Sequence, residues 1–152
     1  MVGWREWVAL PELGLGFIKA KIDTGARTSA LHAARVDRQG DRVVLTMHPL
    51  QRHDDITVTC EADIVDERSV RDSGGHEEPR LVIRTPLAFA GETRPVEVTL
   101  TNRETMGFRM LIGRTALRGM TVDPSGSYLA QTPPSPKALR AAYPDYRLES
   151  AS

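Results

Sequence analysis

Asp23, Thr24 and Gly25 are the residues of this sequence whose types and order most directly suggest chemistry. They end the apolar run 16–22 and lead into Ala26. A carboxylate on a tight turn, with a hydroxyl beside it and a glycine behind it, can hold a water molecule against a peptide carbonyl. Hydrolysis without a metal or a covalent nucleophile needs one ionised carboxylate to accept a proton and one protonated carboxyl to polarise the carbonyl. The alternative is an ordinary surface turn, because Asp and Gly are common turn residues.

One copy of Asp23 supplies only half of such a pair. Two carboxyls about 3 Å apart share a single proton and titrate together. The other Asp-Ser-Gly of the chain, at 72–74, lies in the polar stretch 66–80. A chain of 152 residues is expected to form one domain. The sequence therefore predicts a homodimer in which two Asp23 side chains meet at a two-fold axis.

A second motif covers residues 108–114, where apolar residues precede Gly113 and Arg114. It predicts a strand that passes close to the Asp23 turn, because Gly113 permits a backbone approach that a Cβ atom would block. Thr115 is then expected to cap a short helix that ends at Gly119.

Together the two motifs resemble the retropepsin-like aspartic proteases. Residues 20–33, 100–103 and 106–114 are similar to a bacterial retropepsin-like endopeptidase family that is often labelled ATP-dependent zinc protease, and the likeness spans Trp4 to Leu129. The resemblance implies a homodimeric all-β closed barrel with one short helix, in a single domain. No cofactor is implied.

The resemblance also implies roles for individual residues. Asp23 would be the catalytic carboxylate, Thr24 would brace the two loops across the dimer axis, and Gly25 would present backbone groups to the dyad. Gly113 and Arg114 would support the loop from behind. Substrate contacts are also expected for Ala26, Arg27, Gly74, Gly75 and Ile112. Family members are associated with ATP-grasp ligases that add glutamate, which suggests glutamate-rich substrates and a functional link to such a ligase.

Arg27 departs from the viral retropepsins, in which an Asp at this position pairs with the Arg of the Gly-Arg motif. Arg114 is kept here, so it needs another acceptor. Arg27 is expected either to bind an acidic substrate side chain through charge-assisted hydrogen bonds or to pair with an acid of the same dimer.

The composition excludes several partners. Twenty basic and twenty acidic residues give no net charge, which does not favour nucleic acid or an anionic membrane. The single Cys60 excludes an intrachain disulfide and suits a reducing compartment. No run approaches the length of a membrane span, and the N-terminus lacks the pattern of a signal peptide. A cytoplasmic location is expected.

Strand patterns dominate the chain. Alternating or β-branched segments separated by turn residues predict strands over 4–10, 16–22, 42–47, 56–65, 80–85, 94–101 and 109–112. A further strand is expected after the Asp23 turn at 29–33, where His32 is interpreted as a structural histidine. Residues 123–126 predict a hairpin turn. The whole pattern favours an all-β fold with a little helix.

Two segments lie outside this pattern. The polar stretch 66–79 predicts a two-stranded arm with Gly74 and Gly75 at its tip, which could close over a peptide, or else a surface loop. The protease domain is expected to occupy residues 1–131 and a Pro-rich tail residues 132–152. In the tail, Lys137 to Tyr143 predicts a short helix that packs on a partner subunit or extends loosely.

Two other functions stay open at this stage. A zinc peptidase would draw on His32, His48, His53, Cys60, His76, Glu77 and Glu78. Their spacing lacks the His-Glu-x-x-His pattern and paired cysteines, and a mobile arm is a poor place for a metal site. A peptide-binding module without catalysis is the other alternative, although an intact Asp-Thr-Gly favours retained chemistry.

Overall fold

The computed structural model of the chain describes residues 1–51, 53, 56–71, 74–102 and 107–146. In this part of the chain the structure is mostly strand, with two short 3-10 helices and one α-helix. The strands are β1 (Val2–Leu10), β2 (Leu15–Ile22), β3 (Ser29–His32), β4 (Arg35–Gln39), β5 (Arg42–Met47), β6 (Val58–Arg71), β7 (Glu77–Phe89), β8 (Glu92–Thr101), β9 (Met110–Ile112) and β10 (Val122–Ser127). The helices are η1 (Pro11–Leu13), η2 (Arg114–Leu117) and α1 (Pro136–Ala142).

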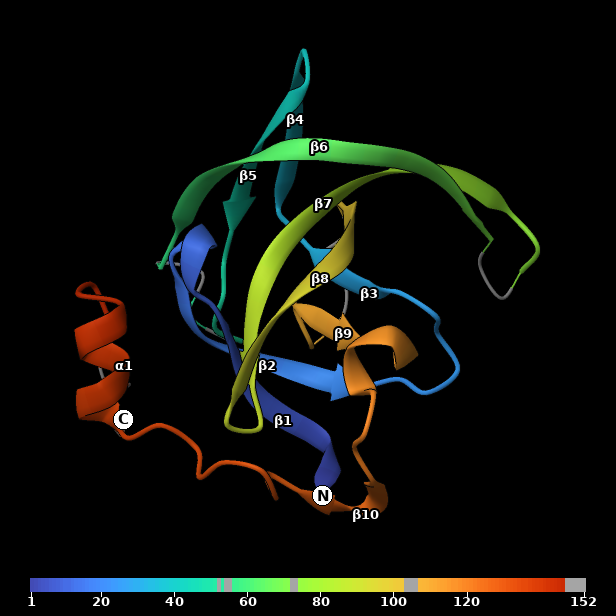
Figure 1. The fold of residues 1–152 in the computed structure, drawn as a ribbon. Coiled ribbons are helices and arrows are strands. Elements are labelled where there is room, and N and C mark those ends of the chain that lie inside the picture. Colours follow the sequence, from blue (N-terminus) through green and yellow to red (C-terminus); the bar gives the residue numbers. More distant parts are fainter. Residues whose placement is uncertain (52, 54–55, 72–73, 103–106, 147–152) are drawn as a thin grey trace.

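The strands form one ten-stranded sheet in the order β10-β1-β2-β9-β3-β8-β7-β6-β5-β4. An additional pairing of Ala9 with Ala88 joins β1 to β7. The strands from β1 to β7 in this order therefore close into a ring, and β6, β5 and β4 continue the sheet beyond it. Figure 1 shows β6 and β7 as long curved ribbons, and the two strands pair with each other. The expected single-domain, mostly β architecture with one short helix is confirmed.

The core follows from residue alternation along the strands. In β1, Glu6, Val8 and Leu10 are buried, while Trp7 and Ala9 between them are only partly buried. Alternation of this kind places one face of a strand on the core and the other toward solvent. β8 is different, because Val96 and the residues from Val98 to Thr101 are all buried. It lies between β3 and β7 inside the sheet.

Two predictions at the ends of the sheet were wrong or incomplete. Residues 123–126 form no hairpin, because they belong to β10, which pairs in parallel with β1. The local turn chemistry is present, since Asp123 Oδ1 accepts hydrogen bonds from the Ser125 amide and hydroxyl. The turn is accommodated by a shift in the register of the β1–β10 pairing between Gly3 and Arg5. The strand β4 was not predicted, and it pairs with β5 beyond the ring.

The polar stretch 66–79 forms strand rather than a surface loop over most of its length. β6 reaches Arg71 and β7 begins at Glu77, with paired residues from Ile64 with Ile83 to Arg71 with Glu77. The first part of β6 pairs with β5 instead, so β6 connects the ring to the outer strands. Gly74 and Gly75 are exposed at the tip of this β6–β7 arm, while Asp72 and Ser73 lie outside the described residues.

The C-terminal segment packs on its own chain. α1, expected over 137–143, lies against β2 and helps to bury Leu50, Ile56, Leu139, Tyr143 and Tyr146. Ser135 caps the helix by accepting a hydrogen bond from the Ala138 amide at 3.1 Å. Within the part of the chain that the structure describes, no helix has the length and apolar character needed to cross a membrane.

Candidate active site

The Asp23 turn lies where two parallel strands end together. β2 and β9 pair in parallel, with Ile22 opposite Ile112. The Asp23 amide donates to the Ile112 carbonyl at 2.9 Å, which holds the first residue of the turn against the end of β9. The Asp23 carboxylate accepts a hydrogen bond from the Gly25 amide at 3.0 Å. The side chain is therefore oriented by the turn that follows it.

The 3-10 helix η2 holds the second half of the turn. The amide of Arg114 donates to the Ala26 carbonyl at 2.8 Å, and that of Thr115 donates to the Arg27 carbonyl at 3.1 Å. Amides at the start of a helix lack partners within the helix, so these carbonyls satisfy them. The expectation that Thr115 caps this helix was wrong. Its N-cap is Gly113, which is two residues before Thr115, and no side chain of the described residues caps it.

Arg114 also supports the turn through its side chain. Its Nη1 donates to the Thr24 carbonyl at 3.0 Å. This backbone oxygen is the acceptor that replaces the missing carboxylate at position 27. The guanidinium thus fixes the residue next to Asp23 from within the same chain.

Gly113 lies directly against the backbone at Thr28. A Cβ atom placed on Gly113 would be 2.6 Å from the Thr28 carbonyl carbon and 2.7 Å from its oxygen. The Gly113 amide donates to the buried Ser29 hydroxyl at 3.1 Å. The chain therefore passes so closely behind the turn that only glycine fits at this position.

The turn opens onto a large pocket of about 1190 Å³. Its walls come from the Asp23 turn, the β6–β7 arm, β8, the end of β9 and the residues around η2. The lining residues are Asp23, Gly25, Ala26, Arg27, Thr28, Ala30, Arg68, Ser69, Val70, Arg71, Arg80, Arg84, Pro95, Val96, Glu97, Thr99, Leu111, Thr115 and Arg118.

The charge of this pocket differs from that of the whole chain. Among the described residues that line it, six are arginines and two are acidic, although the chain as a whole carries no net charge. Arginine presents planar N–H groups that match a carboxylate in a bidentate manner. The pocket is therefore suited to a ligand that carries several negative charges.

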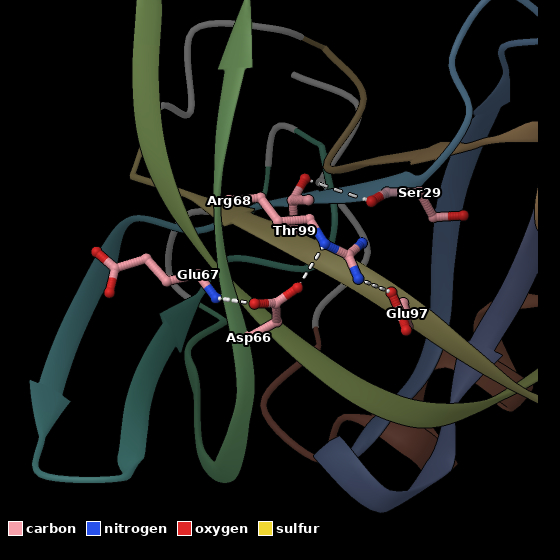
Figure 2. A network of polar contacts seen from close by, with 6 residues as sticks. All are labelled: Ser29, Asp66, Glu67, Arg68, Glu97 and Thr99. Carbon is pink, nitrogen blue, oxygen red and sulfur yellow. Dashed lines mark hydrogen bonds and ion pairs between the residues drawn. The ribbon is translucent and has the colours of Figure 1, made fainter.

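An ion-pair network spans one wall of the pocket, as Figure 2 shows. Arg68 on β6 donates through Nε to Asp66 Oδ2 at 2.7 Å, and its Nη2 lies 2.6 Å from Glu97 Oε2 on β8. The Glu67 amide also donates to Asp66 at 2.8 Å. This amide and the Arg68 side chain together lower the pKa of Asp66. Asp66 and Glu97 thus hold Arg68 from two sides.

The structure brings some of the expected site residues together and separates others. Asp23, Gly25, Ala26 and Arg27 line the pocket, and Thr24 is exposed beside them. Gly74 and Gly75 lie at the arm tip and do not line it in this structure.

Ile112, the remaining expected substrate contact, is fully buried in the core. Adjacent residues of a strand point to opposite faces. Its neighbour Leu111 lines the pocket instead.

The candidate zinc ligands do not form a cluster in the described part of the chain. No group of three or more His, Cys, Asp or Glu side chains there is arranged to hold a metal ion. Cys60 is partly buried among apolar neighbours, and burial raises the pKa of its thiol to about 11.

Sequence reasoning did not identify most of the arginines of the pocket. Arg68 and Arg71 come from β6, Arg80 and Arg84 from β7, and Arg118 follows η2. The one available signal was the spacing of Arg80 and Arg84, which places them on the same face of a strand.

The chain is similar to several curated proteins over most of its length. A protein of Shewanella pealeana named "Probable alpha-L-glutamate ligase" is 44% identical over 133 residues, which are 84% of this chain and 29% of that protein. A protein of Parasynechococcus marenigrum with the same name is 44% identical over 133 residues, 84% of this chain and 28% of that protein. The chain thus spans less than a third of the length of these relatives.

A solved structure and a family model also match. A Legionella pneumophila protein of unknown function has the same fold, with a TM-score of 0.68 and 23% identity over 86% of this chain and 97% of that one. The model of the RimB-like family, described as retropepsin-like aspartic endopeptidase RimB, matches residues 1–133. Of the motif residues that carry the resemblance, Arg103 and Met106 lie outside the described residues. With the Asp23 turn, the close approach of Gly113 and this match over most of the chain, the protein belongs to the RimB-like family of retropepsin-like aspartic endopeptidases.

Proposed function

We propose that this protein is an aspartic endopeptidase that hydrolyses peptide bonds in acidic, glutamate-rich substrates. The observation that carries the proposal is that Asp23 lies at the edge of a pocket of about 1190 Å³ whose described lining includes six arginines. The carboxylate would activate a water molecule, and the arginines would bind the side chains of the substrate.

The proposal requires a second copy of the chain. Among the described lining residues, Glu97 is the acid other than Asp23, and its carboxylate lies 2.6 Å from Arg68. Because Arg68 occupies this carboxylate, Glu97 is not placed to hydrogen-bond a substrate carbonyl as the second carboxyl of the reaction. A second Asp23, supplied by an identical subunit across a two-fold axis, would complete the pair. Thr24 and Gly25 are exposed and available for such a contact.

In this arrangement one Asp23 would accept a proton from the attacking water while the other donates a hydrogen bond to the scissile carbonyl. The ring of strands would serve as the retropepsin-like barrel, and the β6–β7 arm would close over the substrate.

The names of the relatives support the substrate class, because a glutamate ligase would produce glutamate-rich chains. We therefore also propose a functional link to such a ligase.

The first prediction is that Asp23→Asn abolishes hydrolysis. Asparagine has nearly the same shape but cannot accept the proton from water. We expect the wild-type protein to cleave a hexaglutamate peptide, the Asp23→Asn variant to lose at least about a thousandfold in rate, and a hexaglutamine peptide to be cleaved more slowly. Mass spectrometry of the products over time measures all three.

Repeating the cleavage assay in excess metal chelator distinguishes the zinc peptidase from the proposed aspartic peptidase. Activity that persists in excess chelator supports the aspartic mechanism. Cleavage that is lost in the chelator but retained in Asp23→Asn would contradict it. Peptide binding without cleavage by the wild-type protein under any condition would instead favour the binding module.

A further inference from the structure

The pocket arginines differ in how strongly acidic residues of the chain hold them. Arg68 has two acidic partners, Asp66 and Glu97. Arg71 lies 3.0 Å from Glu77, and Arg80 lies 3.8 Å from Glu78. Arg27, Arg84 and Arg118 have no acidic partner among the described residues, which leaves their charges available to a ligand.

Arg84 is notable because strand register gives it an acidic neighbour that it does not bind. Its Cα partner on β8 is Glu97. Opposite charges facing each other across an antiparallel pair normally attract. Glu97 is instead bound by Arg68, which reaches it from β6 on the other side of β7. Arg68, Arg84 and Glu97 all line the pocket. The Arg68–Glu97 ion pair, which leaves Arg84 without Glu97, therefore lies in the wall of the pocket.

A second arginine of β7, four residues before Arg84, is also incompletely satisfied. Arg80 lies opposite Arg68 in the register of β6 and β7, which places two positive charges side by side. The Nε of Arg80 is buried and has no hydrogen-bond partner among the described residues, and the ion pair of Arg80 with Glu78 is long. A buried donor without an acceptor is costly, so a ligand carboxylate that reaches Arg80 would relieve an unfavourable arrangement.

We propose that Arg84 is a specificity-determining residue that binds a side-chain carboxylate of the substrate. The Asp66–Arg68–Glu97 network keeps Arg84 available, because it holds Glu97 away from it. This inference rests on the proposed function for its substrate class. Beyond that function, it assigns substrate binding to Arg84 and explains how the Arg68–Glu97 ion pair keeps Arg84 without an acidic partner.

The test measures binding in the Asp23→Asn background, where the peptide stays intact. Fluorescently labelled hexaglutamate and hexaglutamine peptides are titrated and followed by anisotropy. Replacing Arg84 by Gln should weaken hexaglutamate binding about tenfold or more and leave hexaglutamine binding unchanged. The matched control is Arg140→Gln, which removes the same charge from an exposed position on α1 outside the pocket. It should change binding less than about twofold.

Double variants separate a specific contact from a general effect of charge. Arg68→Gln should weaken hexaglutamate binding, because the released Glu97 turns to Arg84. Adding Glu97→Gln to Arg68→Gln should restore binding, whereas adding it to Arg84→Gln should not. The two double variants carry the same formal charge. Equal affinities of the two doubles, or an Arg84→Gln variant that binds as tightly as its parent, would overturn the proposal.

The readouts keep this proposal separate from the proposed hydrolysis. Thermal unfolding of each variant verifies that it is folded. If the wild-type protein cleaves nothing while Arg84→Gln still loses hexaglutamate binding, the hydrolytic function fails and the Arg84 contact stands. If the wild-type protein cleaves hexaglutamate and Arg84→Gln does so with an unchanged KM, the Arg84 contact fails and the hydrolytic function stands.

Discussion

At the scale of single residues, the Asp23 turn depends on a very close backbone contact behind it. Gly113 supplies that contact, and the η2 amides and the Arg114 side chain supply the hydrogen bonds. All of these partners come from one segment, residues 113–115. A short stretch of chain therefore determines how the catalytic carboxylate of the proposed mechanism is presented.

We predict that Gly113→Ala destabilises the protein by about 3 kcal/mol, because the added Cβ would overlap the Thr28 backbone and the chain would have to move. Urea unfolding measures the change. Gly107→Ala is the matched control, since its added Cβ would meet only the Gln51 side chain at 3.4 Å. Similar unfolding midpoints for the two variants would show that the contact behind the turn has little importance.

Sequence reasoning succeeded at Gly113 and failed at the arginines for different physical reasons. Gly113 follows an apolar strand, and together with the Asp-Thr-Gly turn this local pattern predicted the close approach of two backbone segments that the structure shows. The basic pocket depends on which residues of β6, β7 and β8 face each other. The balanced net charge of the whole chain also concealed it.

At the scale of elements, the C-terminal helix α1 acts as a cover for β2. The Tyr143 hydroxyl donates to the Phe17 carbonyl at 2.6 Å and accepts from the Phe17 amide at 3.1 Å. One side chain thus satisfies both backbone groups of a strand residue, as a neighbouring strand would. Burial raises the pKa of Tyr143 to about 12, so the hydroxyl keeps its proton and can donate at neutral pH.

We predict that Tyr143→Phe lowers the free energy of unfolding by about 1–3 kcal/mol, because it leaves the Phe17 amide and carbonyl without this partner. Tyr128→Phe is the control, since the Tyr128 hydroxyl has no hydrogen bond within the described residues and its ring keeps its contact with Arg5. Chemical denaturation compares the two. Hexaglutamate cleavage should be unchanged in both, and equal stabilities would contradict the proposed role of the hydroxyl.

Element boundaries were predicted well where apolar alternation was strong and poorly where pairing holds polar or turn-forming residues in a strand. β2 and β5 match their predicted ranges to within one residue. β6 and β7 extend much further, because cross-strand pairing stabilises polar residues that show no strand pattern of their own. β10 contains the residues of a turn, and only its pairing with the N-terminal strand makes it extended.

At the scale of the whole molecule, the proposed mechanism depends on two chains. The described part of one chain places a single unpaired carboxylate in the pocket, and the pocket opens beside the exposed Thr24 and Gly25. A dimer in which these loops meet would bring two basic pockets to a shared site. A long acidic substrate could then contact both subunits.

The last prediction uses mixed subunits to test this dependence. Wild-type protein is unfolded and refolded together with an equal amount of Asp23→Asn, so that subunits combine at random. If each active site needs one Asp23 from each chain, mixed dimers are inactive and hexaglutamate cleavage falls to about half of that of the same amount of wild-type protein refolded alone. Refolding with an equal mass of an unrelated protein is the control. Activity that stays unchanged in the mixture, while native mass spectrometry with a mass tag on one kind of subunit shows that mixed dimers form, would mean that one Asp23 is sufficient and would remove the shared dyad from the mechanism.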